Sequence, residues 1–157
     1  MEPIKGQSTD KAWILKDLAS TKNLGEQLIR QLPDPEILLL KGPLGAGKTS
    51  LVQGMAKALE INEPITSPTF ALSHHYAGDL GKLVHLDLYR LENKASANEL
   101  FLQEEEEAKS LQALLVIEWP ERLSIKIHNG WQIELNYARN GWRRAKLQAI
   151  SSASEIH

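Results

Sequence analysis

The chain has 157 residues, of which 24% are charged and 42% hydrophobic, with a formal net charge of −2 and no cysteine. This composition suits a globular domain with a sizeable core, and it excludes disulfides, zinc–thiolate sites and a cysteine nucleophile. The chain is slightly acidic, so we expect no direct RNA-binding surface. It lacks both a membrane-length apolar run and a signal-peptide core, so we expect no membrane association and a cytoplasmic location. One domain is expected over residues 1–157, with loose termini at 1–10 and 151–157.

Two elements are predicted in the first third of the chain. Ala12–Leu15 is a candidate edge strand. Thr21 stands where the N-cap of a helix would. Two prolines, Pro33 and Pro35, are expected to stop this helix because proline cannot continue it. Its apolar face is marked by leucines at i+4 spacing, Leu24, Leu28 and Leu32.

The segment Gly42–Thr49 fits the phosphate-loop pattern G-x-x-x-x-G-K-[ST] at every fixed position. The run before it, Ile37–Leu40, has the continuous apolar character of a buried parallel strand. Strand, loop and helix therefore follow in the required order. Gly54 lies inside that helix, where it costs roughly 1 kcal/mol relative to alanine, which indicates close packing. The helix has one apolar face, formed by Leu51, Val52, Met55, Ala56 and Leu59.

Such a loop binds phosphate mainly through its backbone. Glycines allow conformations closed to other residues, and the loop N–H groups and the positive end of the helix point at one place. Lys48 is expected to place its charge on the β- and γ-phosphates, and the Thr49 hydroxyl to hold Mg²⁺. The residues predicted to bind the nucleotide here are Gly42, Leu44, Gly45, Ala46, Gly47, Lys48, Thr49 and Ser50.

The next stretch predicts a loop followed by a hairpin. Two prolines and three hydroxyl residues make Glu63–Phe70 a loop, of which Thr66–Phe70 is the last part. It lies where nucleotide switches place a segment that senses the γ-phosphate, although a simple connector has the same composition. The strands Phe70–Tyr76 and Leu83–Leu88, joined by a turn at Gly78–Gly81, are predicted to pair antiparallel.

A polar segment and a second buried strand come next. Asn93–Ser110 is expected to hold a short helix anchored by Leu100 and Phe101. Its four glutamates at 104–107 indicate a solvated helix face rather than a metal site. Ala113–Ile117 is the second buried-strand run, and it ends in Glu118.

The tail alternates between apolar and polar residues. Trp131–Tyr137 and Leu147–Ala149 are predicted strands, and Asn140-Gly141 between them is a strong hairpin signal. These elements together predict a single-domain α/β P-loop fold with a mixed parallel and antiparallel sheet flanked by helices.

Phosphoryl chemistry needs a metal opposite Lys48, held or oriented by an acid that ends a second apolar strand. Glu118 is the best candidate for that acid. Asp87, near the end of another strand, is the second candidate, as a base toward the attacking water or as a holder of a metal-bound water. A role as an ordinary turn acid stays open for Asp87. Within the Thr66–Phe70 loop, Ser67 or Thr69 could contact phosphate or Mg²⁺.

Other polar residues carry weaker signals. Adjacent histidines such as His74-His75 point to opposite faces of a strand, so a transition-metal cluster with His85 and Asp87 is not favoured. Three arginines could stabilise phosphate charge, although for each alone a surface role is favoured: Arg90, Arg143 and Arg144.

Several short motifs in order resemble the TsaE (YjeE) family of bacterial ATPases. They span residues 37–123, and the segment Thr21 to Gly25 fits as well. Pro43 and Leu86 depart from the residue types common in that family. Motifs in a fixed order are more specific than the phosphate loop alone, and here they are Gly42–Thr49, Thr66–Phe70, His85–Arg90 and Glu118–Glu121.

The resemblance implies roles for particular residues. Thr49 and Glu118 would ligand Mg²⁺, and Asp87 would be needed for hydrolysis. Trp119 would lie near the site, and Thr21 would approach the nucleotide base or ribose. A P-loop sheet of mixed direction is also implied, in agreement with the hairpins above.

The resemblance further implies threonylcarbamoyl modification of the adenosine next to the anticodon in certain tRNAs. Members work as ATPases with TsaD and TsaB proteins, so tRNA would be met only through that complex. We therefore expect an ATP- and ADP-binding, Mg²⁺-dependent cytoplasmic ATPase that is slow without partners. A small-molecule kinase and a nucleotide-gated assembly module with negligible hydrolysis are the alternatives. A GTPase is disfavoured because the guanine-reading N-K-x-D pattern is absent.

Overall fold

The computed structural model describes residues 10–32, 36–66 and 72–150. Its helices are α1 (Leu18–Gln31), α2 (Lys48–Ala58) and α3 (Lys94–Leu111), with short 3-10 turns η1 (Pro120–Arg122) and η2 (Arg139–Gly141). Its strands are β1 (Lys11–Leu15), β2 (Ile37–Lys41), β3 (Ser73–Ala77), β4 (Lys82–Asp87), β5 (Leu114–Glu118), β6 (Gly130–Tyr137) and β7 (Arg143–Ile150).

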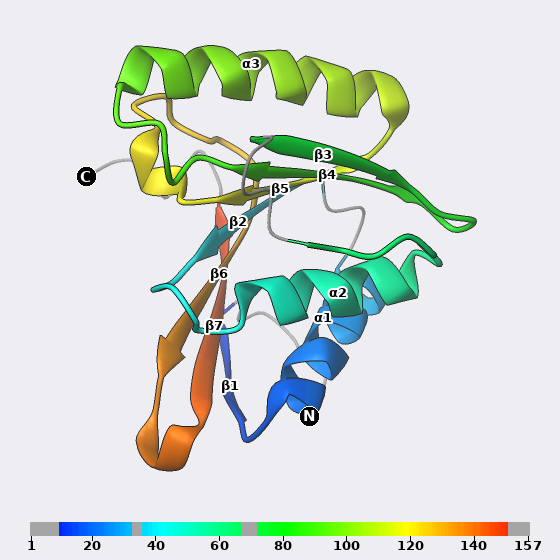
Figure 1. The fold of residues 1–157 in the computed structure, drawn as a ribbon, viewed down its shortest axis with the longest axis vertical. Coiled ribbons are helices and arrows are strands. Elements are labelled where there is room, and N and C mark those ends of the chain that lie inside the picture. The colour runs from blue at the N-terminus through cyan, green and yellow to red at the C-terminus, as the bar shows by residue number, and fades with distance from the viewer. Residues whose placement is uncertain (1–9, 33–35, 67–71, 151–157) are drawn as a thin grey trace.

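Over these residues the strands form one seven-stranded sheet in the order β1-β7-β6-β2-β5-β4-β3. The helices α1 and α2 cover one face, and α3 covers the other (Figure 1). Strands β6, β2, β5 and β4 run parallel, whereas β3 pairs with β4, and β7 with β6 and β1, antiparallel. The predicted mixed sheet, both hairpins and the edge position of β1 are therefore confirmed. Predicted strand residues 70–71 lie outside the described part.

Strand β2 shows why its sequence is uniformly apolar. Leu38 and Leu40 belong to the core beneath α1 and α2, while Ile37 and Leu39 belong to the core beneath α3. Successive side chains of a strand point to opposite faces, so a strand covered on both sides needs apolar residues throughout. This burial on both faces fixes the central strand from which the glycine loop starts.

The helices α1 and α2 pack so closely that glycine is required in both. A Cβ on Gly54 would lie 1.9 Å from the Lys22 carbonyl oxygen, and one on Gly25 would lie 2.2 Å from the Leu51 carbonyl oxygen. The close packing inferred for Gly54 is therefore confirmed. It holds the start of α1 beside the helix that follows the glycine loop.

The predicted cap of the first helix is wrong. The N-cap is Asp17, whose carboxylate accepts a hydrogen bond from the Ser20 N–H at 2.7 Å. Thr21 lies inside the first turn and is only 1% exposed. Aspartate and threonine both cap helices, and here α1 starts one turn earlier than Thr21 suggests. The helix ends at Gln31, and the two prolines expected to stop it lie outside the described residues.

The prediction of a short helix within Asn93–Ser110 is also corrected. In place of a short helix, α3 has 18 residues and is capped by Asn93. The glutamate run is not wholly a solvated face, because Glu104 is buried and lies 2.9 Å from His75 Nε2 on β3. A neighbouring strand supplies that partner, and local sequence does not show it.

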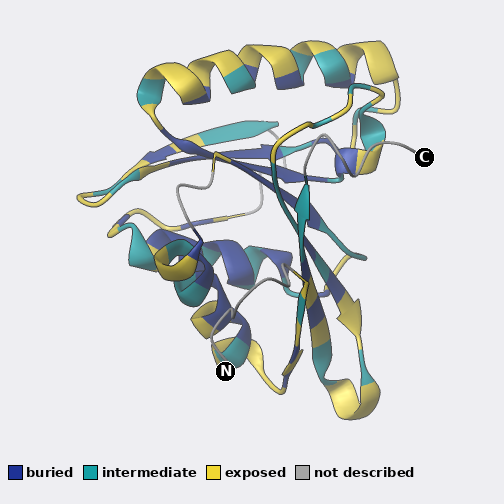
Figure 2. Cartoon of the chain, turned by 180° about the vertical axis from the view of Figure 1, so that it is seen from behind, coloured by how far each residue is buried: buried dark blue, intermediate teal, exposed yellow. Residues whose placement is uncertain are grey.

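Burial follows the layers of the fold. Buried residues gather where the sheet meets its helices, whereas the outer side of α3 and the turn between β6 and β7 are exposed (Figure 2). Among the described helices, none is both long and apolar enough to cross a membrane.

Candidate functional site

Three parallel strands end at one edge of the sheet, and each leads to a predicted site residue. β2 runs into the loop that begins at Gly42, β5 ends at Glu118, and β4 ends at Asp87. In register, Glu118 pairs with Leu40 on one side and with Asp87 on the other. Ligands of open α/β sheets bind outside such carboxyl ends. A pocket of about 560 Å³ lies there, lined by loop residues and both acids.

The loop conformation depends on glycine at its two ends. Gly42 has φ of 149°, and a Cβ there would lie 2.4 Å from the Leu135 carbonyl oxygen on β6. Gly47 has φ of 105° and is the N-cap of α2, with no side-chain capping bond. Few other residues adopt these backbone angles. The first N–H groups of α2 thus reach the pocket edge uncapped by a side chain.

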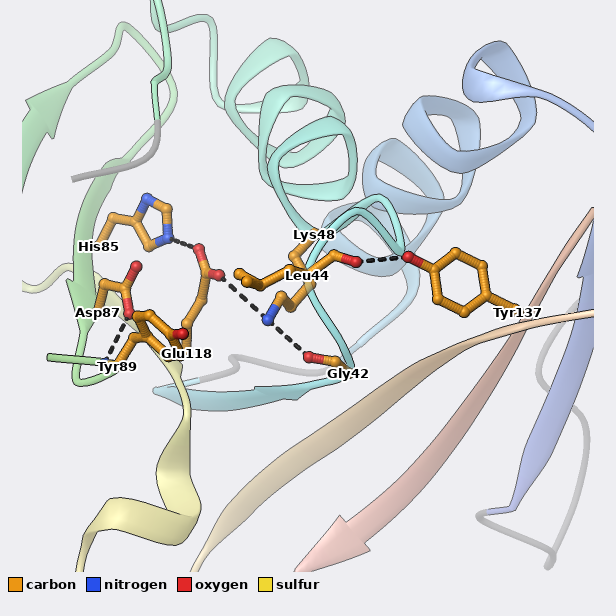
Figure 3. Close-up of polar contacts among 8 residues, drawn as sticks. All are labelled: Gly42, Leu44, Lys48, His85, Asp87, Tyr89, Glu118 and Tyr137. Carbon is orange, nitrogen blue, oxygen red and sulfur yellow. Dashed lines mark hydrogen bonds and ion pairs between the residues drawn. The ribbon is translucent and has the colours of Figure 1, made fainter. Parts of the chain in front are cut away.

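Lys48 lies between the loop and the end of β5. Its Nζ donates to the Gly42 carbonyl oxygen at 2.7 Å and lies 3.8 Å from Glu118 Oε1 (Figure 3). The ammonium also lies 4.4 Å from the centre of the Trp119 ring. A buried charge is costly unless it is paired, and these three contacts pair the lysine, which is 6% exposed.

Glu118 is oriented by a buried histidine. His85 Nε2 lies 2.5 Å from Glu118 Oε2 (Figure 3). Toward an ionised carboxylate, which can only accept, the imidazole donates from Nε2. Within the described residues, His85 Nδ1 has no hydrogen-bond partner. One oxygen of Glu118 thus faces His85 and the other faces Lys48, in surroundings where such contacts are stronger than in water.

Asp87 stands beside this group at the end of β4. Its Oδ1 accepts a hydrogen bond from the Tyr89 N–H at 2.9 Å. Burial raises the pKa of the Asp87 carboxyl, and the nearby Glu118 carboxylate raises it further; the Tyr89 N–H and the charges of His85 and Lys48 act in the opposite direction. A carboxyl with a raised pKa is a better proton acceptor than an ordinary aspartate once it is ionised.

Aromatic residues close one side of the pocket. The Tyr89 and Trp119 rings are 4.9 Å apart, centre to centre, and both residues line the pocket. Trp119 has φ of 60°, uncommon for a residue other than glycine. The structure therefore places Trp119 beside the site, where the resemblance had implied it.

The predicted nucleotide-binding residues do not all face the pocket. Thr49 and Ser50 line it together with Gly45 and Gly47, and so does Leu44, whose side chain is exposed. Ala46 is fully buried in the core under α1 and α2.

Thr21 lies beside the end of the glycine loop and is not among the described residues that line the pocket. The hydroxyl donates to the Asp17 carbonyl oxygen at 3.3 Å. Its methyl group supports the loop, since a Cβ on Gly47 would lie 3.5 Å from Thr21 Cγ2. The structure thus gives Thr21 a packing contact with the loop, and its approach to the nucleotide base or ribose stays a prediction.

The remaining sequence candidates are spread around the pocket. Of the Thr66–Phe70 loop, only Thr66 lies in the described part. Arg90 lines the pocket. Arg143 Nη2 donates to the Gly45 carbonyl oxygen at 3.3 Å, and Arg144 is exposed. One of the three arginines therefore contacts the loop itself.

The oxygen donors present suit a hard cation. Thr49 contributes a hydroxyl and Glu118 a carboxylate, and Mg²⁺ takes few protein ligands of this kind besides waters and phosphate oxygens. In the described part of the chain, no three His, Asp or Glu side chains are placed to hold a metal by themselves. The donor set thus fits Mg²⁺ carried with a nucleotide.

Two contacts of the site were missed by sequence reasoning. His85 lies two residues before Asp87 on one strand, so period-two alternation puts both on one face, and this signal could have linked His85 to the site. The contact of the Tyr137 hydroxyl with the Leu44 carbonyl joins residues 93 positions apart. Nothing local marks that contact.

The fold and site define the class of this protein: an α/β protein with a glycine loop between a central parallel strand and a helix, and acids at the ends of two neighbouring strands. A family model described as "Threonylcarbamoyl adenosine biosynthesis protein TsaE" matches residues 15–145. The chain therefore belongs to the TsaE family, which places it in tRNA threonylcarbamoyladenosine biosynthesis.

Individual relatives agree with this assignment. The chain is 41% identical over 133 residues to the TsaE protein of Nostoc sp., covering 85% of this chain and 82% of the relative. It is 44% identical over 112 residues to that of Synechocystis sp., covering 71% of each. The crystal structure of the Bacillus protein YdiB matches with a TM-score of 0.71 and 25% identity, over 97% of this chain and 93% of that one.

Proposed function

We propose that this chain binds Mg²⁺–ATP at the carboxyl ends of β2, β4 and β5 and hydrolyses it. The observation that carries the proposal is the buried pair of Lys48 and Glu118, with 3.8 Å between Nζ and Oε1 at the mouth of the glycine loop. A cation and a carboxylate held at this point suit a phosphate group and its metal, respectively. ADP, the product, would occupy the same loop.

Each residue then has a distinct task. Lys48 offsets the charge of the β- and γ-phosphates, while Thr49 and Glu118 hold Mg²⁺, which supplies charge neutralisation on the phosphate oxygens. Asp87 accepts a proton from the water that attacks the γ-phosphorus as the bond to the ADP oxygen breaks. His85 keeps Glu118 oriented through the contact to Oε2.

We further propose that hydrolysis depends on partner proteins of the TsaD and TsaB kind in the cytoplasm, with tRNA met only through their complex. The pocket rim supports docking of a partner. Leu18, Leu44 and Tyr89 line the pocket and are 63%, 61% and 39% exposed, and exposed apolar side chains gathered at one place mark interaction surfaces. A docked partner would also shield the site from water.

Steady-state ATPase assays test this function. We expect slow turnover by the protein alone and a several-fold or larger rise with purified TsaD- and TsaB-like partners, on the scale of coupling energies of about 1–3 kcal/mol. A high rate alone that partners leave unchanged would contradict partner dependence. Nucleotide-dependent partner binding without any turnover would instead favour an assembly module.

Calorimetric titration tests the choice of base. The N-K-x-D pattern that reads guanine is absent from the sequence, so we expect ADP to bind more tightly than GDP. Equal or tighter binding of GDP would overturn the adenine preference while leaving the phosphate site intact.

A further inference from the structure

The outer side of the glycine loop is held by two side chains from the end of the β6–β7 hairpin. The Tyr137 hydroxyl donates to the Leu44 carbonyl oxygen (Figure 3). Arg143 Nη2 donates to the next carbonyl, that of Gly45, at 3.3 Å. Neither Tyr137 nor Arg143 is among the described residues that line the pocket, so both contact the loop from behind.

The sheet register brings the hairpin to this position. β6 runs parallel to β2, with Lys41 opposite Glu134. β2 ends there, whereas β6 continues to Tyr137 and so passes alongside the loop. The approach is close, since a Cβ on Gly45 would lie 3.0 Å from the Tyr137 hydroxyl oxygen.

Arg143 is itself anchored. Its Nη1 donates to the Gly141 carbonyl oxygen at 2.8 Å and to that of Trp142 at 3.3 Å. Its guanidinium lies over the Tyr137 ring, 4.7 Å from the ring centre. The two side chains thus brace each other as well as the loop, and the planar guanidinium serves several acceptors at once.

The direction of these carbonyls decides where the loop N–H groups point. A trans peptide unit is planar, so its C=O and N–H point in opposite directions. A donor that holds the Leu44 carbonyl on the outer side therefore directs the Gly45 N–H toward the inner side. The bond to the Gly45 carbonyl fixes the next peptide unit, whose Ala46 N–H donates to the Pro43 carbonyl oxygen at 3.2 Å and so closes the turn of the loop.

We infer that Tyr137 and Arg143 are positioning residues of the phosphate-binding loop. They hold the carbonyls of Leu44 and Gly45 away from the pocket, which keeps the loop in the conformation that presents its N–H groups to the diphosphate. This inference rests on the proposed nucleotide site. It predicts that losing either donor weakens binding of phosphate groups and leaves the folded domain intact.

The test is the Tyr137→Phe variant, which keeps the ring and removes only the hydroxyl. We expect its Kd for ADP to rise roughly three- to tenfold, the range that one lost hydrogen bond produces. The Kd for inorganic pyrophosphate should rise by the same factor, because pyrophosphate contacts the loop and lacks the base. The melting temperature of the nucleotide-free variant should fall only slightly, because Tyr137 is an exposed residue.

A matched control is Tyr76→Phe on β3. It removes a hydroxyl that lies 2.9 Å from His74 Nδ1, away from the loop. We expect no change in ADP or pyrophosphate binding by this variant. A second pair compares Arg143→Lys, which loses the planar fork, with Arg144→Lys at the next, exposed position of β7. Only Arg143→Lys should bind pyrophosphate more weakly than the wild type.

The outcomes separate the two proposals. If wild-type protein binds neither ADP nor pyrophosphate, the proposed function fails and this inference fails with it. If wild type binds both and Tyr137→Phe and Arg143→Lys bind them equally well, only the positioning role is overturned. A loss of affinity that comes with a large drop in the melting temperature of the nucleotide-free variant would also overturn it, since that pattern reports a general stability role.

Discussion

The pocket has two walls that are built in opposite ways. The inner wall consists of the buried ionisable side chains of Lys48 and Glu118, 6% and 4% exposed, with the fully buried His85 behind Glu118. The outer wall is the glycine loop braced by the hairpin, where Leu44 and Tyr137 are 61% and 55% exposed. Removing one partner of a buried charge leaves the other unpaired, whereas most exposed substitutions change stability little. Substitutions on the inner wall should therefore reduce activity far more than substitutions on the outer wall.

The largest loss of activity is expected for Lys48→Ala, because Lys48 lies where the two walls meet. Loss of the ammonium removes the charge that offsets the phosphates, so ATP turnover should fall on the order of 10²-fold or more. The fold should persist because Glu118 keeps its contact with His85, and circular dichroism can check this. Lys57→Ala is the control on the same helix, since the Lys57 side chain is 77% exposed. Unchanged turnover by Lys48→Ala would refute the phosphate site.

Glu118→Gln should change the response to Mg²⁺. A neutral amide is a poorer partner for a hard cation or its waters, and we expect half-maximal activity to need roughly 10–100 times more Mg²⁺. The amide oxygen can still accept from His85, which limits the structural change. A Mg²⁺ titration of turnover measures this, with the exposed Glu121→Gln as control. An unaltered titration curve would remove Glu118 from the metal site.

Asp87→Asn should separate chemistry from binding. Loss of a positioned base lowers turnover by about 10²-fold or more, while ADP affinity should change little because the amide oxygen can still accept from the Tyr89 N–H. Single-turnover kinetics and ADP titration measure the two quantities. If ADP affinity falls and turnover per bound ATP is kept, Asp87 acts in binding instead.

The same variant should alter the dependence of stability on pH. Burial raises the pKa of Asp87 in the folded state, so above about pH 4 the folded state binds more protons than the unfolded state until the folded pKa is passed. The contribution of Asp87 to the unfolding free energy therefore falls as pH rises through that window. Asp87→Asn should be slightly more stable than wild type at neutral pH and should lack this decline. Urea unfolding of both proteins at several pH values measures this difference. A wild-type unfolding free energy that does not fall relative to that of Asp87→Asn as pH rises through this window would contradict the prediction.

The smallest effect is expected on the outer wall. Leu44 offers its backbone carbonyl to Tyr137, and its side chain is exposed. Leu44→Ala keeps that carbonyl, so the unfolding free energy should change by no more than about 0.5 kcal/mol and ADP affinity of the isolated protein should be essentially unchanged. A loss of ADP affinity like that of Lys48→Ala would show that side chains, too, build the outer wall.

Much of the site was predictable from sequence because its signals are local. Strand Ile37–Lys41, the glycine loop and α2 follow one another directly, and each has its own periodicity or glycine pattern. Glu118 and Asp87 were found because each comes at the end of an apolar strand. The helix start was misplaced because Thr21 was taken as the cap, although aspartate, here Asp17, is preferred over threonine at that position.

The tertiary structure alone decided which distant residues meet. The order of strands puts β4 beside β5, and only then does His85 contact Glu118 across 33 positions of sequence. The contact of Glu104 with His75 and that of Tyr137 with the glycine loop arise in the same way. Periodicity reports which face of an element is buried, but it carries no information on which element lies against that face. That choice depends on the packing of the whole sheet and its helices.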